Sequence, residues 1–134
     1  MTIDEANALI ADMIPGRAGM RFASIDPGRV TARLDVLAAD IAPNGFLHAA
    51  VAVALADTAC GFGTIASLPE GATSFTTLEL KTNFVGTARE GALLCDAELV
   101  HGGRTTQVWD ARVARESDGK PVALFRCTQL LIYP

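Results

Sequence analysis

The hydrophobic pattern of this chain is most distinctive in its middle. From about His48 to about Ser67 nearly every residue is small and apolar, and the run Ala49–Ala56 contains no polar residue. A helix that is apolar nearly all round is typical of a buried position. The pattern therefore predicts one long central helix that the rest of the chain covers.

After this helix, apolar and polar residues alternate with the two-residue period of a strand. Turns that contain glycine or charged residues separate four expected strands, of which the last three form a meander: Phe75–Phe84, Leu93–Leu99, Thr105–Arg115 and Val122–Ile132. In the first strand one face would carry Leu78, Leu80, Thr82 and Phe84, and the other Thr77, Glu79, Lys81 and Asn83. Thr77 is thus expected on a polar face.

Two elements are expected before the central helix. Thr2 can cap a short helix that ends at Pro15-Gly16 and whose apolar face consists of Ala6, Leu9, Ile10 and Met13. The turn sequence Asp26-Pro27-Gly28-Arg29 then joins Met20–Ile25 and Val30–Val36 as a hairpin. This order predicts an α+β fold, a single domain over residues 1–134 in which a curved antiparallel sheet wraps around one long helix.

Composition limits the partners and the location that we expect. The 11 basic and 15 acidic residues give a net charge of −4 without a basic cluster, which argues against nucleic acid. The acidic N-terminus differs from a signal peptide, and the longest apolar run, Ala49–Ala56, is too short to span a bilayer, so no membrane role is expected. Cys60, Cys95 and Cys127 are expected to be reduced and buried in a cytoplasmic protein, with a catalytic thiol as the lesser alternative.

One carboxylate, Asp57, interrupts the apolar helix. Burying an ionised group is costly unless it is paired or opens on a cavity. The residues one turn away on its side of the helix are all apolar or small: Val53, Ala54, Cys60 and Gly61. Asp57 is therefore the first candidate for a catalytic group.

The segment Gly45-Phe46-Leu47-His48-Ala49-Ala50, followed by Ala54-Leu55-Ala56-Asp57-Thr58-Ala59, resembles the PaaI-like acyl-CoA thioesterases of the hotdog-fold superfamily. Their pattern is G-x-L-H-G-G and then a helix similar to A-L-x-D-T-A, with the same spacing from His to Asp. The resemblance implies a hotdog fold that hydrolyses a coenzyme A thioester to the free acid and CoA without a cofactor. It also implies a homodimer or a dimer of dimers.

The residues also suggest how such a reaction would proceed. The first N–H groups of the helix, near Ala49 and Ala50, lie at its positive end and suit a developing oxyanion. Asp57, as general base or as nucleophile, follows His48 by nine residues, which places it about 13 Å further along the axis and on the opposite side of the helix. One helix cannot present both groups to one carbonyl, and the resemblance implies that two subunits share each site.

Other residues have two interpretations each. Thr77 falls where related enzymes carry a Ser or Thr, so the resemblance implies that it holds the water or assists the acid; the alternative is a residue that only favours the strand. His48 would contact the thioester, or it fixes the loop before the helix. Ala42 stands at the family's usual Asn or Gln, so Asn44 would have to replace it. Ala49 and Ala50, in place of two glycines, add methyl groups where the acyl thioester approaches. The residues that could bind CoA phosphates, or be ordinary surface charges, are Arg89 and Arg104.

Different functions stay open at this point. A non-catalytic acyl-CoA binding protein would keep the fold and the pocket, and a hotdog hydratase or dehydratase would act on a similar thioester, although its D-x-N-P-x-H pattern is absent. A purely structural subunit would leave Asp57 without a role. No metal is expected, because His48 and His101 are the only histidines and neither has a partner at ligand spacing.

Overall fold

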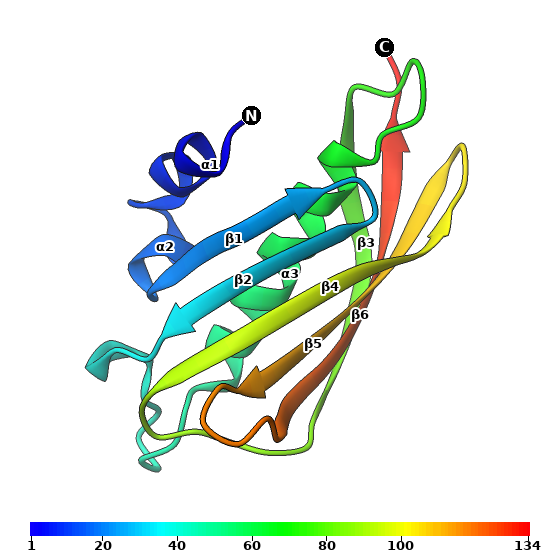
Figure 1. Cartoon of the computed structure of the whole chain (residues 1–134). Helices are drawn as coiled ribbons and strands as arrows, with labels where there is room; N and C mark the ends of the chain where they lie inside the picture. The colour runs from blue at the N-terminus through cyan, green and yellow to red at the C-terminus, as the bar shows by residue number, and fades with distance from the viewer.

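The structure, a computed structural model that describes all 134 residues, consists of one curved antiparallel sheet and one long helix, α3 (Ala49–Ala66), against it (Figure 1). Two short helices, α1 (Ile3–Ile10) and α2 (Ile14–Arg17), precede the sheet, and a short 3-10 helix lies at Ala38–Asp40. The six strands are β1 (Met20–Asp26), β2 (Arg29–Asp35), β3 (Ser74–Phe84), β4 (Ala92–Gly102), β5 (Thr106–Arg115) and β6 (Pro121–Ile132). Their order in the sheet is β1-β2-β4-β5-β6-β3, so the predicted fold class, hairpin and meander are confirmed.

The N-terminal helix is capped as predicted but ends earlier. The Thr2 hydroxyl accepts a hydrogen bond from the N–H of Glu5, and the Glu5 carboxylate accepts one from the N–H of Thr2. The prediction that Pro15-Gly16 stops this helix is wrong, because Pro15 lies in the first turn of α2, where its missing N–H costs nothing. Of the predicted apolar face, only Ala6 and Ile10 are buried.

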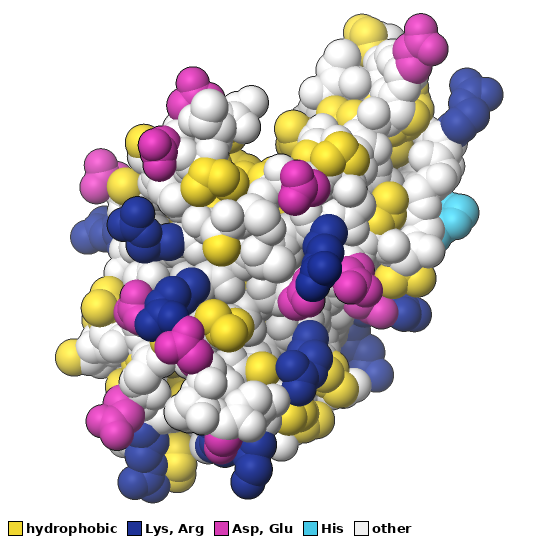
Figure 2. All heavy atoms as spheres, in the orientation of Figure 1, with side chains coloured by type: hydrophobic (Ala, Val, Ile, Leu, Met, Phe, Trp, Pro, Cys, Tyr) yellow, Lys and Arg dark blue, Asp and Glu magenta, His cyan; other side chains and the backbone are white.

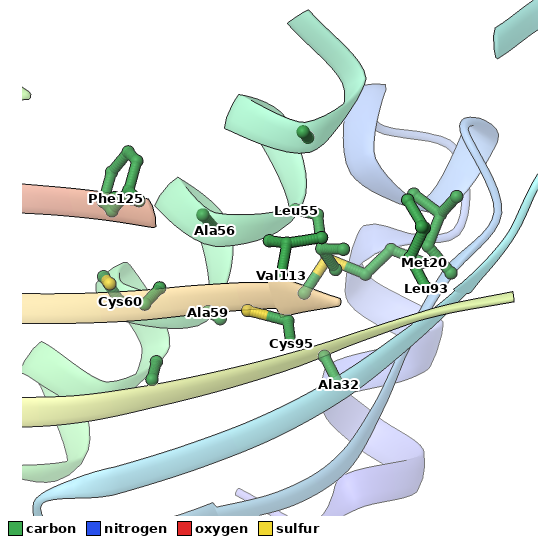
Figure 3. Packing of buried hydrophobic residues seen from close by; sticks show 14 of the residues in the cluster. Met20, Ala32, Leu55, Ala56, Ala59, Cys60, Leu93, Cys95, Val113 and Phe125 are labelled. Carbon is green, nitrogen blue, oxygen red and sulfur yellow. The ribbon is translucent and has the colours of Figure 1, made fainter. Parts of the chain in front are cut away.

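Helix α3 packs on the concave face of the sheet through a stripe of small residues at helical spacing. Figure 3 shows Ala56, Ala59 and Cys60 facing the strands. The opposite side of the helix, which includes Val53 and Asp57, is only partly covered. The prediction that the chain covers the helix all round is therefore wrong. The helix is long and apolar enough to cross a membrane, but its stripe belongs to the core.

One close contact fixes the depth of α3 in the sheet. The ring of Trp109, fully buried on β5, lies so close to Gly63 that a Cβ there would be 2.4 Å from its nearest ring atom. The Trp109 N–H donates to the side-chain oxygen of Gln107, and the Gln107 amide donates to the carbonyl of Ser67 at the end of α3. This contact and these two bonds attach the C-terminal half of the helix to β5.

Strand β3 contains a bulge that the sequence pattern does not reveal. Thr77 pairs with Gln129 of β6 but Glu79 pairs with the adjacent Thr128, so Leu78 is an extra residue in the ladder. The bulge turns Thr77 to the helix side of the sheet, the same side as Leu80. The prediction that Thr77 lies on the polar face of the strand, opposite Leu80, is therefore wrong.

The apolar side chains of β3 are also more exposed than their pattern suggests. This strand lies at the edge of the sheet (Figure 1), and Leu80 and Phe84 are 41% and 49% exposed. Its second edge pairs with no other strand. An unpaired, partly apolar edge strand is a surface suited to another chain.

Charged side chains of both signs are interspersed over the face of the molecule that Figure 2 shows. On the strands, Arg29 pairs with Asp96 and Arg126 with Asp110, all on exposed side chains. Such pairs add little stability each but leave no single-sign patch on these strands.

Replacing Gly63 with alanine is expected to destabilise the protein strongly. The added methyl group would collide with the buried Trp109 ring, and overpacking of this kind costs about 1–3 kcal/mol. The midpoint of urea unfolding, followed by Trp109 fluorescence, measures this loss. The control is Gly28→Ala, where a Cβ would meet nothing within 4 Å and only the positive φ of 82° is unfavourable. A Gly63→Ala midpoint equal to that of the wild type would contradict the packing described.

Candidate active site

Asp57 opens on an apolar trough. The trough has a volume of about 580 Å³ and runs over the exposed side of α3 between α1, β1 and β3. Its polar side chains, Asp57, Thr58 and Thr77, are accompanied by apolar or small residues: Met1, Leu9, Ile25, Gly61, Phe62, Ile65, Ala66 and Phe75. This cavity is called the Asp57 trough below, and its composition suits an apolar ligand with one polar end.

The carboxylate of Asp57 has no partner inside the chain. Its Oδ1 atom is buried and makes no hydrogen bond. Desolvation by this burial raises the pKa of the carboxyl above its ordinary value. A half-buried, unpaired acid in a cavity is a frequent sign of a functional group, because a structural carboxylate is normally hydrogen bonded.

The bulge at Leu78 brings Thr77 into the same cavity. Without the extra residue the Thr77 side chain would face away from α3, but it lines the Asp57 trough. Asp57 and Thr77 are thus one pair of predicted site residues that the structure places together.

Gly61 and Phe75 shape the trough beside Asp57. A Cβ on Gly61 would lie 3.2 Å from the tip of the Phe75 ring, so the absence of a side chain leaves room for the ring against the helix. Phe62, at the next position of α3, packs against Phe22, and the two ring centroids are 4.5 Å apart. Two aromatic rings therefore form part of the apolar wall.

The loop before α3 determines which N–H groups are available at the helix N-terminus. His48 is the N-cap residue, and its Nδ1 atom accepts a hydrogen bond of 3.0 Å from the N–H of Ala50. The N–H of Ala49 has no acceptor in the chain. Of the two predicted oxyanion donors, Ala49 alone is free.

A second cavity lies beside Ala49. This Ala49 hollow has a volume of about 260 Å³ and is lined by Asn44, Phe46, Leu47, Ala49, Ala52, Phe84, Gly86, Thr87 and Val122. The side-chain oxygen of Asn44 accepts from the N–H of Phe46 and so shapes the tip of the loop. Ala42, at the place of the family's amide residue, contributes only its backbone to that turn.

Sequence reasoning missed the residue that anchors this loop. Asp40 is almost fully buried, its carboxylate accepts from the N–H of Leu37, and its carbonyl accepts from the N–H of His48. Burial raises the pKa of the Asp40 carboxyl. In the sequence, Asp40 is an acid that follows Leu37 by three residues in an apolar stretch. This context is also that of an ordinary surface loop.

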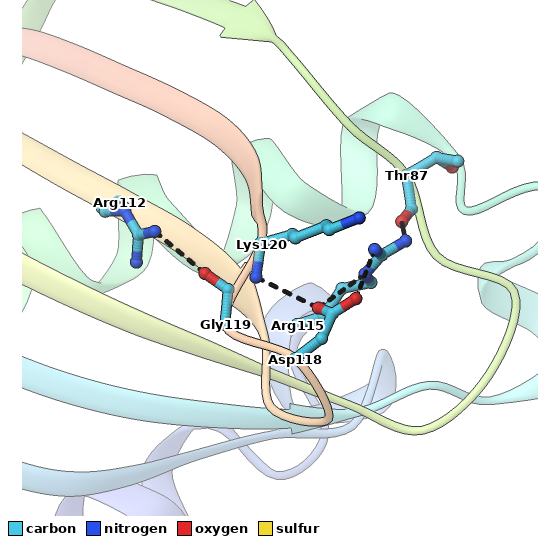
Figure 4. A network of polar contacts seen from close by, with 6 residues as sticks. All are labelled: Thr87, Arg112, Arg115, Asp118, Gly119 and Lys120. Atoms are coloured by element: carbon cyan, nitrogen blue, oxygen red, sulfur yellow. Dashed lines mark hydrogen bonds and ion pairs between the residues drawn. The ribbon is translucent and has the colours of Figure 1, made fainter.

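A polar network supports the far wall of the Ala49 hollow. Arg115 donates to the carbonyl of Thr87 and makes a two-pronged ion pair with Asp118 in the β5–β6 turn (Figure 4). Hydrogen bonding to Arg115 lowers the pKa of the Asp118 carboxyl. The network connects the β3–β4 connection to the β5–β6 turn and so positions Thr87.

The two candidate arginines lie far apart. The Arg89 guanidinium lies over the ring of Phe46, 4.4 Å from its centroid, at the loop that borders the Ala49 hollow. Arg104 follows the other end of β4, and its carbonyl accepts a hydrogen bond from the Tyr133 hydroxyl. Strand β4, whose 11 residues span about 35 Å, runs between the two arginines.

The predicted site residues therefore divide into two groups within one chain. Asp57 and Thr77 line the Asp57 trough, whereas Ala49 and Asn44 line the Ala49 hollow. Ala49 and Asp57 are about 12 Å apart along the axis of α3. A single chain does not bring the free N–H and the carboxylate to the same carbonyl.

The other reactive side chains do not form a site. Contact with Cys127 and burial raise the pKa of Cys60, and burial raises the pKa of Cys95 to about 12, so these buried thiols are not nucleophiles. No group of three His, Cys, Asp or Glu side chains lies close enough to hold a metal ion.

Comparisons with known proteins agree with this fold and geometry. The sequence profile of the thioesterase superfamily matches residues 44–122. A 1,4-dihydroxy-2-naphthoyl-CoA hydrolase of Listeria monocytogenes is 31% identical over 110 residues, which are 82% of this chain and 88% of the relative.

Two solved structures are similar over most of the chain. A thioesterase of Pseudomonas aeruginosa superposes with a TM-score of 0.91 at 29% identity and covers 100% of this chain and 96% of its own. A Streptococcus mutans protein bound to acetyl-CoA has a TM-score of 0.78 at 26% identity and covers 86% of this chain and 90% of its own. The chain therefore belongs to the thioesterase superfamily of hotdog-fold thioester hydrolases.

Proposed function

We propose that this protein hydrolyses acyl-CoA thioesters at sites shared between two copies of the chain. The observation that carries the proposal is the division of one reaction's groups between two cavities: an unpaired carboxylate in the Asp57 trough and a free N–H at the Ala49 hollow. Each cavity has half of what thioester hydrolysis requires, a base and an oxyanion donor.

The chemistry needs few polar groups. Asp57 removes a proton from a water molecule, the water oxygen bonds to the carbonyl carbon, and the negative charge that forms on the carbonyl oxygen is stabilised by the N–H of Ala49. The carbon–sulfur bond then breaks. Coenzyme A leaves as a thiolate and takes up a proton, which requires no strong acid because a thiol has a pKa of roughly 8.5.

Strand β3 supplies the geometry that would join the two halves. Its free edge, 11 residues long, can pair with the same edge of a second copy about a two-fold axis. Antiparallel pairing places the Thr77 end of one strand beside the Phe84 end of the other. Because Phe84 lines the Ala49 hollow and Thr77 the Asp57 trough, each trough then meets the partner's hollow, twice per dimer.

The same pairing distinguishes the two parts of the substrate. Arg89, stacked on Phe46 beside the Ala49 hollow, is placed to meet a CoA phosphate at that end of the site. The Streptococcus mutans structure, which contains acetyl-CoA, supports a CoA ligand for this fold. In the cytoplasm, the location that we expect for this protein, an enzyme would have access to CoA thioesters.

The Asp57 trough would receive the acyl group. Its volume of about 580 Å³ and its Phe62 and Phe75 walls suit a bulky apolar or aromatic acyl group rather than an acetyl group. The bicyclic acyl group in the name of the Listeria relative is of that kind.

Asp57→Asn is expected to abolish turnover while stabilising the fold. Loss of the base should lower kcat at least about 100-fold in an assay of CoA release. Because burial raises the pKa of the Asp57 carboxyl, its ionised form opposes folding, so the amide should raise Tm near neutral pH. The gain should vanish in acid, below the unfolded pKa, where the wild-type carboxyl is protonated in both states.

The pH profile of the wild type tests the same assignment. Since the ionised carboxylate is the base, kcat/KM should fall as the pH drops through the raised pKa, at a higher pH than for an ordinary Asp. Unchanged turnover in Asp57→Asn would remove Asp57 from the mechanism.

Ala49→Pro deletes one N–H group and tests the shared site. Proline is favoured at the first helical position, and His48, at φ −66° and ψ 131°, already has the backbone that a following proline needs. The helix should therefore stay intact while kcat falls about 100- to 1,000-fold.

Co-expression of differently tagged Ala49→Pro and Asp57→Asn chains should then restore activity. A purified heterodimer combines one intact Ala49 with one intact Asp57 at one of its two sites, and should approach half the wild-type rate. Heterodimers that are as inactive as either parent would place both groups in one chain and refute the shared site.

Gly61→Ala should change the acyl preference. The added methyl group presses on Phe75 and narrows the trough, so kcat/KM for octanoyl-, benzoyl- and 1,4-dihydroxy-2-naphthoyl-CoA should fall roughly tenfold. Acetyl-CoA hydrolysis is the internal control and should be spared. A uniform change over all four substrates would show that the acyl group lies elsewhere.

A further inference from the structure

The side chain of Gln129 is buried without any hydrogen bond. It lies on β6 with 0% of its surface exposed, and neither its Oε1 nor its Nε2 atom has a partner. A buried amide that gives up its bonds to water without replacing them destabilises the folded state. Native proteins rarely keep such a group, so this one requires an explanation.

Gln129 is the middle member of a row of polar residues that crosses three strands. Its cross-strand neighbours are Thr77 on β3 and Gln107 on β5, and all three lie on the helix side of the sheet. Directly paired residues in antiparallel strands have Cβ atoms about 5 Å apart, within reach of a glutamine side chain. The row ends at the Asp57 trough, which Thr77 lines.

Gln107, at the opposite end of the row, already has hydrogen bonds to both of its side-chain polar groups. Gln107 uses its oxygen for Trp109 and its amide nitrogen for the carbonyl of Ser67. Along β6 the neighbours of Gln129 on the same face are apolar and buried, Cys127 and Leu131. Thr77 is the neighbour whose hydroxyl makes no hydrogen bond and which borders an open cavity.

Three unpartnered polar groups thus lie at the floor of one cavity or directly behind it. They are the buried Oδ1 atom of Asp57, the buried amide of Gln129 and the hydroxyl of Thr77, which is an exposed residue that lines the trough. A buried water molecule needs two to four polar partners, and such waters commonly satisfy groups of this kind. A water held there against Asp57 would be the one that the proposed hydrolysis consumes.

We propose that Gln129 is a positioning residue for this water: when the trough is occupied, its amide turns to form a hydrogen bond with the Thr77 hydroxyl that the chain alone does not make, and so orients that hydroxyl toward the water that Asp57 activates. The role rests on the proposed thioester hydrolysis. It explains why an amide that weakens the fold lies behind the trough, since groups that serve a reaction are often kept at the expense of stability.

The test replaces Gln129 with methionine, an unbranched side chain of similar length without hydrogen-bonding groups. Removal of an unsatisfied buried amide should raise Tm, while kcat for octanoyl-CoA should fall on the order of tenfold, the scale found for outer hydrogen-bonding partners of reactive groups. KM should stay close to that of the wild type, because the amide does not contact the substrate. A merely structural amide would give the higher Tm with unchanged kcat, and this result would overturn the proposal.

A matched control and a double-mutant cycle sharpen the result. Gln107→Met removes the neighbouring amide, whose bonds are satisfied, and should lower Tm without lowering kcat below the unfolding transition. If Gln129 acts through Thr77, then Thr77→Val and Gln129→Met should not be additive in kcat. Fully additive losses would overturn the route through Thr77.

Two further measurements keep the test decisive. Should Gln129→Met fail to fold, Gln129→Asn retains the amide but withdraws it from Thr77 and should also lower kcat; full activity of that variant would refute the role. The wild type is assayed alongside. If it releases no CoA from any acyl-CoA, the proposed function fails, whereas an active wild type with an equally active Gln129→Met variant refutes only the role of Gln129.

Discussion

The structure depends on the close approach of a helix of small residues to the concave face of a curved sheet. Where Gly63 meets the Trp109 ring there is no room for a single additional carbon, and the bonds of Gln107 fix the same end of the helix. A bulkier helix would stand further off the sheet and leave cavities between them. Because the sheet covers only one side of α3, the other side is free to carry a carboxylate into an apolar trough.

The stability of the core allows unfavourable groups elsewhere. Around α3 the chain has a continuous cluster of 23 buried hydrophobic residues. Against this background the chain tolerates an unpaired acid at Asp57 and an unbonded amide at Gln129, both near the same trough. Other buried polar side chains, such as Asp40 and Gln107, are hydrogen bonded, and the Thr82 hydroxyl on β3 is a third buried group without a partner. Two of the three unsatisfied side chains thus lie near a cavity where a ligand or water can offset the cost.

Most of this architecture could be predicted from signals within a few residues. The features that depend on pairing between distant segments could not. The turn at Pro27-Gly28 and the isolation of Asp57 among apolar neighbours can be read within a few residues. The bulge at Leu78 cannot, because the alternation in β3 is regular and only the register against β6 reveals the extra residue. Likewise, the pattern identifies Leu80 as apolar but not that it stays 41% exposed on the last strand of the sheet. Gln129 has the sequence context of an ordinary strand residue, and its burial without a partner depends on the packing of three strands and α3.

The cap at the start of α3 has a consequence for the tautomer of His48. A neutral imidazole has one nitrogen that donates and one that accepts. Because Nδ1 accepts the N–H of Ala50, the hydrogen of the neutral ring must lie on Nε2, which leaves the exposed ring with a donor and no free lone pair. Capping the helix thus leaves this histidine only one polar group to offer a partner, the Nε2–H donor, because its acceptor nitrogen is already used by the backbone of its own helix.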